Sequence, residues 1–473
     1  MRGCCASIES PKLRSQLPAS PAEEGPMGLP AEIQDPLPTP SRRQLAWLLI
    51  ACSLAVFGLA LAGMLRGQEP FASWFFVFAW WSYIFFLDGA TYLRRGSSIL
   101  IDRPRGFLYL VPWSAAFWLF FEIANLQLAN WYYAGLPVDT LSRWLGIFVS
   151  FATVLPGVFE TTDFLSTFRI AERARCNPET WRVTRNRCQW MILFGVAFLA
   201  LPMLFPRYFF PLIWGATALL LEPYLAKRGE TSLWSHMAAG RPAVPLRILL
   251  AGAICGLCWE SWNFWASAKW IYTVPFFEEV KLFEMPLLGF LGFPPFALEC
   301  YTFARFLVAK GWIPEWETDL PRRVVNRRRQ LSWALAATLL CIPAIFLVDR
   351  FLVRSTAPQV AEFKSLDADQ VHKFESLSIR SAAQLAGALG EGQTFEFLGE
   401  GQQAQLTTEL HLARHALMGH RGVEWLASVN VHSLEVLAQL DGEELLRKLL
   451  LEGNGPAPLP SPPEVRHWVR RAK

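Results

Sequence analysis

Apolar runs of about the length needed to cross a lipid bilayer recur along this chain, and they constrain its fold more than any other feature. We identify nine of them, and they cover residues 44–65, 71–93, 107–128, 144–167, 189–205, 208–226, 246–267, 285–308 and 331–350. Hydrophobic residues make up 53% of the 473 positions, so the runs dominate the composition. Because a helix satisfies its own backbone hydrogen bonds in lipid, the sequence predicts an all-α, polytopic membrane protein with about nine transmembrane helices.

The density of Lys and Arg alternates from one loop between runs to the next. One set of loops carries them in groups: Arg94, Arg95, Arg103, Arg105, Arg173, Arg175, Arg182, Arg185, Arg187, Lys227, Arg228, Arg241, Lys310, Arg322, Arg323, Arg327, Arg328 and Arg329. The alternate loops carry only Arg66, Arg143, Arg207, Lys269 and Lys281. This bias predicts a multi-pass protein of the cell (inner) membrane, with a cytoplasmic N-terminus and, after nine spans, an extracytoplasmic C-terminal domain. The basic loops lie between spans, so we do not expect nucleic acid as a partner.

Composition divides the chain into further parts. The first 41 residues are rich in Pro, Ser and Glu and contain no apolar run, which predicts a disordered cytoplasmic tail. After this tail we expect membrane repeat 1 (42–170), membrane repeat 2 (188–309), a ninth transmembrane helix (331–353), a soluble helical domain (356–452), and a Pro-rich linker with a basic tail (453–473). The nine cysteines are scattered and indicate no disulfide framework.

Two short segments of the soluble domain are similar to each other. LSIRSAAQLAGAL at 377–389 matches VNVHSLEVLAQL at 429–440, and in each a serine, Ser381 or Ser433, stands where an N-cap would begin a short amphipathic helix. The pattern resembles helix-hairpin-helix-like repeats, although the hairpin glycine of the DNA-binding versions is missing. Because the predicted topology places this domain outside the cytoplasm, we expect it to have a protein partner.

The membrane region contains an internal repeat. FEIANLQLANWYYAGLP at 121–137 matches WESWNFWASAKWIYTVP at 259–275, since both read aromatic-Glu-x-x-Asn, then Trp-x-Tyr, then Pro. Further pairs at a nearly constant offset are Glu160 with Glu299, each four residues after a proline, and Asp88 with Glu222. Each unit holds four spans, an even number, so both units enter the membrane the same way round. We therefore predict two parallel four-helix repeats with a shared site at their interface.

Acidic residues within the apolar runs are the strongest candidates for chemistry. By the helical rise, each of four glutamates lies on the order of 20 Å along its run, near the middle of the membrane. Charged groups are costly at that depth and mark a functional site by default, and a protonated carboxylic acid in an apolar pocket is a suitable proton donor. The structural alternative is that these side chains hydrogen-bond between helices. We predict four catalytic residues: Glu122, Glu160, Glu260 and Glu299.

Aromatic and amide side chains surround these acids. The Glu-x-x-Asn spacing places the amide one turn from the acid on the same helix face, where it can orient the acid. The aromatic density predicts a pocket for a long apolar substrate, whose cationic intermediate the ring faces would stabilise. The competing interpretation is an ordinary interfacial aromatic belt or core packing. The predicted substrate-binding residues are Asn125, Trp131, Tyr133, Trp259, Trp262, Asn263, Trp270 and Tyr272.

Several sequence motifs of known membrane enzymes are missing from this chain, and their absence argues against the corresponding reactions. His236 is the only histidine before the C-terminal domain, which argues against His-rich di-iron oxygenases and H-E-x-x-H intramembrane proteases. There is no P-loop and no G-x-G-x-x-G beside a strand, which argues against nucleotide-driven chemistry. His411 and His415 have the i, i+4 spacing of metal ligands but no clear further ligand. We therefore expect no metal and no cofactor.

The repeat resembles the small membrane lycopene cyclases of heterodimeric and archaeal type. Those proteins are duplicated three-helix units, each with an acidic residue and an Asn, then Trp-x-Tyr, then a Pro-x-Glu-Glu motif. The first part is matched in both units, by Glu122, Asn125, Trp131 and Tyr133 and by Glu260, Asn263, Trp270 and Tyr272. The second part departs from the family, since Pro156 to Glu160 and Pro295 to Glu299 have wider spacing and a single Glu.

The resemblance covers residues 75–308, each unit has an extra span, and the C-terminal domain has no counterpart. It implies a redox-neutral cyclisation or isomerisation of a polyene or prenyl lipid. In such a reaction a Glu protonates a terminal double bond, aromatic rings hold the cation, and a second carboxylate accepts a proton. The implied partner is a membrane lipid or an apolar small molecule.

Two other functions stay open at this point. A proton- or ion-coupled transporter would use the glutamate pairs for coupling, and it predicts a hydrated path and a dependence on membrane potential. A non-enzymatic membrane scaffold would instead work through its outer domain. It predicts that the glutamates tolerate change to Gln, whereas deletion of 356–473 abolishes function.

Overall fold

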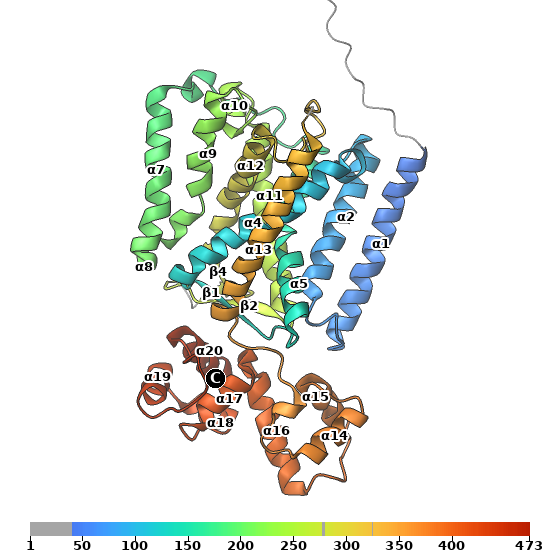
Figure 1. The fold of residues 1–473 in the computed structure, drawn as a ribbon, viewed down its shortest axis with the longest axis vertical. Coiled ribbons are helices and arrows are strands. Elements are labelled where there is room, and N and C mark those ends of the chain that lie inside the picture. The colour runs from blue at the N-terminus through green and yellow to red at the C-terminus, as the bar shows by residue number, and fades with distance from the viewer. Residues whose placement is uncertain (1–39, 277–279, 324) are drawn as a thin grey trace, which may run out of the picture. The chain divides into compact units, whose positions relative to one another are not determined.

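A computed structural model of the chain describes residues 40–276, 280–323 and 325–473 (Figure 1). The described residues are mostly helical, and their strands form two short two-stranded sheets. The predicted disordered tail, 1–41, lies outside the described residues except for its last two positions. Those two residues belong to the first helix, which begins at Pro40.

Among the described residues, eight helical segments are long and apolar enough to cross a membrane. They are Pro40–Leu65 (α1), Pro104–Leu128 (α4), Thr140–Ser166 (α5 and α6), Arg185–Leu204 (α7), Pro206–Lys227 (α8, η2 and α9), Ala243–Trp265 (α11), Leu287–Ala309 (η3 and α12) and Arg327–Phe351 (α13). The chain is therefore an all-α, multi-pass membrane protein, as the sequence predicts. The predicted run 71–93 corresponds to α2, Phe75–Arg95, whose Trp, Tyr and Asp residues lower its hydropathy and keep it out of this set.

Three of the predicted runs are interrupted rather than continuous. Their parts are α5 (Thr140–Phe151) with α6 (Val154–Ser166), α8 (Pro206–Phe209) with η2 (Phe210–Ile213) and α9 (Ala216–Lys227), and β4 (Met285–Pro286) with η3 (Leu287–Gly292) and α12 (Phe293–Ala309). Prolines account for two of these breaks, because η2 and α12 each carry a proline in the first turn, where its missing N–H costs nothing. The remaining short elements of this region are α3 (Ile99–Asp102), η1 (Pro178–Trp181), α10 (Leu233–Ala238) and β3 (Lys281–Leu282).

The interior of the membrane region is built by α2, α4, α6, α11 and α12. The helix α6 packs against α2, α4, α11 and α12, and the core between these helices is rich in Trp and Phe. In contrast, α1 packs on α2 and leaves most of its apolar side chains exposed; Trp47, for example, is 60% exposed. Such an exposed apolar surface is what a helix presents to lipid.

The two Trp-x-Tyr segments form a small antiparallel sheet at one end of the helices (Figure 1). The strand β1, Trp131–Ala134, follows α4, and β2, Lys269–Tyr272, follows α11. The register sets Trp131 opposite Tyr272 and Tyr133 opposite Trp270. The outer edge of β1 bonds to the chain leaving α13, since the Tyr133 N–H donates to the Leu352 carbonyl at 2.8 Å. The sheet thus joins the ends of α4, α11 and α13.

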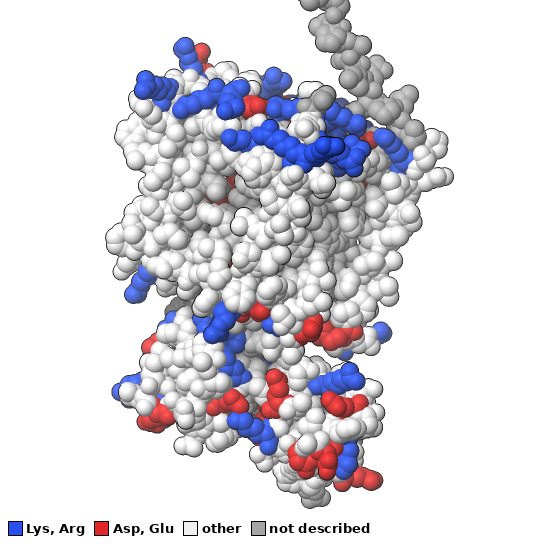
Figure 2. All heavy atoms as spheres, viewed as in Figure 1, with Lys and Arg blue, Asp and Glu red and all other residues white. Residues whose placement is uncertain are grey.

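Charged side chains are distributed unevenly over the surface. Figure 2 shows Lys and Arg gathered at the end of the helices where α10 lies, and a broad zone of uncharged side chains beside it. At that end α2 finishes with Arg94 and Arg95, α9 finishes with Lys227, and α13 begins at Arg327. These residues belong to the loops in which the sequence concentrates Lys and Arg.

The C-terminal residues form a domain of short helices. They are α14 (Ala368–Ser376), α15 (Ala382–Gly390), α16 (Glu400–Arg414), α17 (Gly419–Ala427), α18 (Leu434–Gln439), α19 (Gly442–Leu451) and α20 (Pro462–Ala472), with η4 (Val360–Glu362) and η5 (His415–Leu417). Ser381 accepts a hydrogen bond from the Gln384 N–H, and Ser433 accepts one from the Val436 N–H, which confirms both predicted N-caps. The structure differs from the expected linker and tail at 453–473. Here α20 packs against α18 and α19 and buries Trp468, because its apolar residues recur on one face.

Candidate functional site

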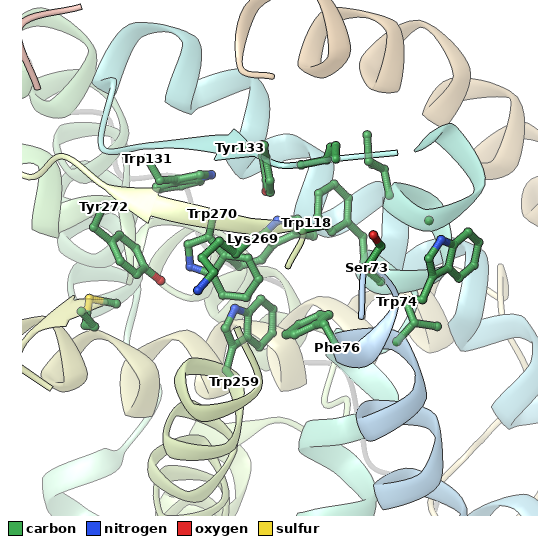
Figure 3. A pocket seen from close by; sticks show the side chains of 18 of the residues that line it. Ser73, Trp74, Phe76, Trp118, Trp131, Tyr133, Trp259, Lys269, Trp270 and Tyr272 are labelled. Carbon is green, nitrogen blue, oxygen red and sulfur yellow. The ribbon is translucent and has the colours of Figure 1, made fainter. Parts of the chain in front are cut away.

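A cavity lined mainly by apolar side chains lies against one face of β1 and β2. It has about 1080 Å³ of empty volume, counting its open mouth, and α2, α4, α5, α11 and α12 contribute to its walls. Five of the eight predicted substrate-binding residues line it: Trp131, Tyr133, Trp259, Trp270 and Tyr272 (Figure 3). A volume of this order accommodates a ligand of drug size or larger.

The strands place four of these rings together. Alternate side chains of a strand point to opposite faces, so Trp131 and Tyr133 of β1 share one face, as do Trp270 and Tyr272 of β2. Because the register sets each Trp opposite a Tyr, the four rings form one wall of the cavity (Figure 3). The sequence identifies both segments by their repeat, but only the strand pairing brings them side by side.

Seven further aromatic residues line the cavity and are absent from the predicted set: Trp74, Phe76, Trp118, Phe151, Trp214, Phe293 and Phe296. Trp118 packs on Trp259 with ring centroids 4.9 Å apart, and Trp214 stacks on Trp118 at 6.3 Å. Trp118 lies one turn before Glu122 on α4, a spacing that offers a sequence signal. No sequence pattern links Trp214 or Phe296 to the repeat motif, so these two emerge only from the packing.

Glu122 is fully buried directly behind this aromatic wall. Its carboxylate accepts hydrogen bonds from the indole N–H of Trp118 at 2.7 Å, the indole N–H of Trp131 at 3.1 Å and the hydroxyl of Tyr133. All three donors are neutral, and all three belong to residues that line the cavity. The carboxylate therefore holds three cavity side chains in place and has a direct hydrogen-bond connection to the Tyr133 hydroxyl.

Glu260 has the same relation to the other strand. The Tyr272 hydroxyl donates to its Oε1 at 2.7 Å, and its buried Oε2 has no hydrogen-bond partner among the described residues. Neither Glu122 nor Glu260 lines the cavity itself. Each lies one hydrogen bond behind a tyrosine that does, so the structure presents two tyrosine–glutamate pairs to one apolar space.

The two predicted asparagines act on the backbone rather than on the acids or the cavity. The Asn263 side chain donates to the Trp270 carbonyl and accepts from the Trp270 N–H, both at 3.0 Å. Asn125 donates to the Trp131 carbonyl at 2.9 Å and accepts from the Asn130 N–H at 2.8 Å. Each asparagine therefore holds the start of a strand against the helix that precedes it.

The remaining predicted residues lie away from the cavity. Trp262 packs on Trp80 with ring centroids 4.7 Å apart. Glu299 accepts two hydrogen bonds from Thr217, from its N–H and its hydroxyl, both at 2.8 Å. Glu160 is buried on α6 near the carboxylate of Asp88. The structure thus brings Glu122 and Glu260 to one site and leaves Glu160 and Glu299 outside it.

The third matched pair of acids has corresponding local contacts. Asp88 accepts from the Leu100 N–H at 2.7 Å at the start of α3, twelve positions further along the chain. Glu222 accepts from the Trp234 N–H at 2.9 Å at the start of α10, also twelve positions further along. In both cases a buried carboxylate satisfies backbone N–H groups at the beginning of a short helix, which is a structural role.

No protein-family model, no curated protein and no solved structure matches this chain at a significant level. Among the residues that the structure describes, no group of three or more His, Cys, Asp or Glu side chains could hold a metal ion. Fold and site therefore define the chain by class, as a multi-pass helical membrane protein with an aromatic cavity and two buried glutamates behind it.

Proposed function

We propose that this protein is an acid-catalysed, redox-neutral cyclase or isomerase of a polyene or prenyl lipid. One observation carries the proposal: the Tyr133–Glu122 and Tyr272–Glu260 pairs face a single cavity that is otherwise lined mostly by Trp, Phe and aliphatic side chains. The hydrocarbon chain of such a lipid carries no functional group other than its double bonds, so the chemistry open to this site is the addition and removal of a proton.

The reaction balances without an oxidant. One pair supplies a proton to a terminal carbon–carbon double bond, with the Tyr272 hydroxyl at the cavity surface and Glu260 behind it to restore its proton. The resulting cation closes on a second double bond of the same chain and forms one new C–C bond. The other pair, Tyr133 with Glu122, then takes a C–H proton from the ring. Trp118, a cavity residue, stabilises the cation with its ring face.

The duplicated organisation forms part of the proposal. We propose nine transmembrane helices in which two parallel four-helix repeats are followed by α13. The paired contacts support this arrangement, since each Glu bonds to a strand tyrosine and each Asn holds the start of a strand. The resemblance to small membrane lycopene cyclases rests on these same residues. We further propose the inner membrane as the location, with a cytoplasmic N-terminus, which the band of Lys and Arg at one end supports (Figure 2).

The test compares three proteins in cells that accumulate an acyclic polyene. Wild type, Glu260→Gln and Glu299→Gln are expressed, and extracted pigments are separated by chromatography. We expect new ring-bearing products from wild type and from Glu299→Gln, because Glu299 lies outside the cavity. Glu260→Gln should reduce them by about 100-fold or more, as loss of a general acid does.

Other results would favour the two alternatives. If wild type is folded in the membrane and forms no new product, this substrate class is excluded. A dependence of ion flux on Glu122 and Glu260 would then favour a transporter. A scaffold with a protein partner for the C-terminal helices would be favoured if deletion of 356–473 abolished function while Glu260→Gln and Glu299→Gln kept it.

A further inference from the structure

A second cavity lies against the other face of β2, and most of its lining residues are charged or polar, unlike those of the aromatic cavity. It has about 700 Å³ of empty volume, and its walls come from β2, the segment before β4, the end of α16, η5 and α20. Three of its lining residues are basic, Lys269, Arg414 and Arg471, whereas Glu284 is the single carboxylate in its walls. The C-terminal domain supplies both arginines, so this cavity is shared between that domain and the membrane region.

Two side chains of this second cavity have hydrogen-bonding capacity that no other described residue uses. His467 borders the cavity, is only 4% exposed, and its Nδ1 has no hydrogen-bond partner among the described residues. Arg414 is exposed and forms no hydrogen bond or ion pair with another described residue. By contrast, Arg471 bonds to Glu284 at 2.9 Å. Burial of an unpartnered imidazole nitrogen costs free energy, which a bound ligand that accepts or donates there would recover.

Lys269 borders both cavities. On β2, Trp270 and Tyr272 face the aromatic cavity, while Ile271 faces the basic one, as strand alternation requires. Lys269, at the start of the strand, lines both. Its ammonium lies 4.0 Å from Glu284 on the basic side. A molecule whose apolar chain lies in one cavity and whose anionic end lies in the other would therefore pass Lys269 at the start of β2.

We propose that the basic cavity binds the phosphate or diphosphate headgroup of a prenyl lipid whose chain occupies the aromatic cavity. This inference rests on the proposed function for the fate of the chain, and it adds the chemical class of the substrate's other end. Phosphoryl oxygens suit this site because arginine pairs with phosphate in a bidentate manner, and two arginines and a lysine approach from different elements. The C-terminal domain then serves to bind the headgroup.

The test measures binding to the purified full-length protein in phosphatidylcholine nanodiscs, followed by tryptophan fluorescence. The probes are farnesyl monophosphate, farnesol and inorganic phosphate. The variants are Arg414→Gln and Arg471→Gln, with Arg447→Gln as the matched control because Arg447 is exposed on α19 and lines neither cavity.

The expected result has three parts. Farnesyl monophosphate binds wild type at least tenfold more tightly than farnesol does. Arg414→Gln and Arg471→Gln each lower the affinity for farnesyl monophosphate by about tenfold, because loss of one charged hydrogen bond changes an affinity by about that factor. Neither variant changes the affinity for farnesol. Arg447→Gln behaves like wild type.

Three results would overturn the proposal. Equal affinities for farnesol and farnesyl monophosphate would show that the headgroup is not bound. Equal behaviour of all three arginine variants would show that it is bound elsewhere. Inorganic phosphate binding as tightly as farnesyl monophosphate would identify a site for a free anion. In each of these cases farnesol binding leaves the proposed function standing, whereas a failure of both prenyl probes to bind would overturn the prenyl substrate class as well.

Discussion

The hydrogen bonds of Asn263 offer a direct test of how the cavity wall is held. The Asn263 amide binds both backbone groups of Trp270, at 3.0 Å each. The pairing with β1 does not satisfy these groups, because Tyr133, opposite Trp270, directs its own N–H and carbonyl to Leu352 and Arg354. Asn263→Ala therefore leaves one N–H and one carbonyl of β2 without a partner.

The size of the effect follows from those two groups. A buried backbone group without a hydrogen bond costs about 1–3 kcal/mol, so the two together should lower the free energy of unfolding by about 2–6 kcal/mol. The measurement is a denaturant titration of the purified protein in mixed micelles, followed by circular dichroism. Gln189→Ala is the matched control, because this amide is exposed on α7 and forms no side-chain hydrogen bond with another described residue. It should change stability by less than about 0.5 kcal/mol.

Asn125→Ala should behave like Asn263→Ala, because it also removes one donor and one acceptor from buried backbone groups. A loss of less than about 1 kcal/mol for either variant, with an unchanged control, would refute the reasoning. It would mean that water or another side chain replaces the amide, so that the strands do not depend on these two residues.

Three further predictions concern other parts of the chain. Arg305→Gln should lower the free energy of unfolding by about 3–5 kcal/mol in the same titration. The reason is that the buried guanidinium bonds to Glu315 at 2.8 Å and to Glu317 at 2.9 Å. A loss below about 1 kcal/mol would contradict this prediction. Burial lowers the pKa of His467 in the folded protein well below its usual value. Below about pH 6.5 the unfolded chain therefore binds more protons than the folded protein does. The free energy of unfolding should then decrease by up to about 1.4 kcal/mol for each unit by which the pH is lowered. Thermal melts at a series of pH values should show a flatter profile for His467→Gln, and an unchanged slope would assign the effect to other groups. Tyr272→Phe should reduce ring-bearing products by about 100-fold in the pigment assay, since it removes the hydroxyl between Glu260 and the cavity; retained activity would place proton transfer elsewhere.

Much of the candidate site is readable from the repeat. The Glu-x-x-Asn and Trp-x-Tyr segments identify Glu122, Glu260 and four of the aromatic residues around the cavity, because the two similar segments adopt similar local structure. The asparagines show the limit of that reasoning. One helical turn separates Asn263 from Glu260, which suggests a contact with the acid, yet the amide bonds to the backbone of β2 instead.

Two of the four predicted catalytic acids, Glu160 and Glu299, show the same limit. Glu299 occupies a comparable depth in its run, but the packing of α12 on α9 turns it toward Thr217. Periodicity along one helix places a residue on a face of that helix. Periodicity does not predict which other helix packs against that face, because this depends on the rotation and crossing angles of helices that are distant in the sequence.

The sequence by itself determined that this is a helical, multi-pass membrane protein. The length and apolar character of each run are local properties, and they suffice for a helix to cross the bilayer without tertiary contacts. It also determined which acids and aromatic residues form matched sets. Only the tertiary structure decided that β1 and β2 pair, that Trp214 and Phe296 complete the aromatic wall, and that α20 brings basic side chains to the far face of β2. These features depend on contacts between distant segments, and no local pattern encodes which segments will meet.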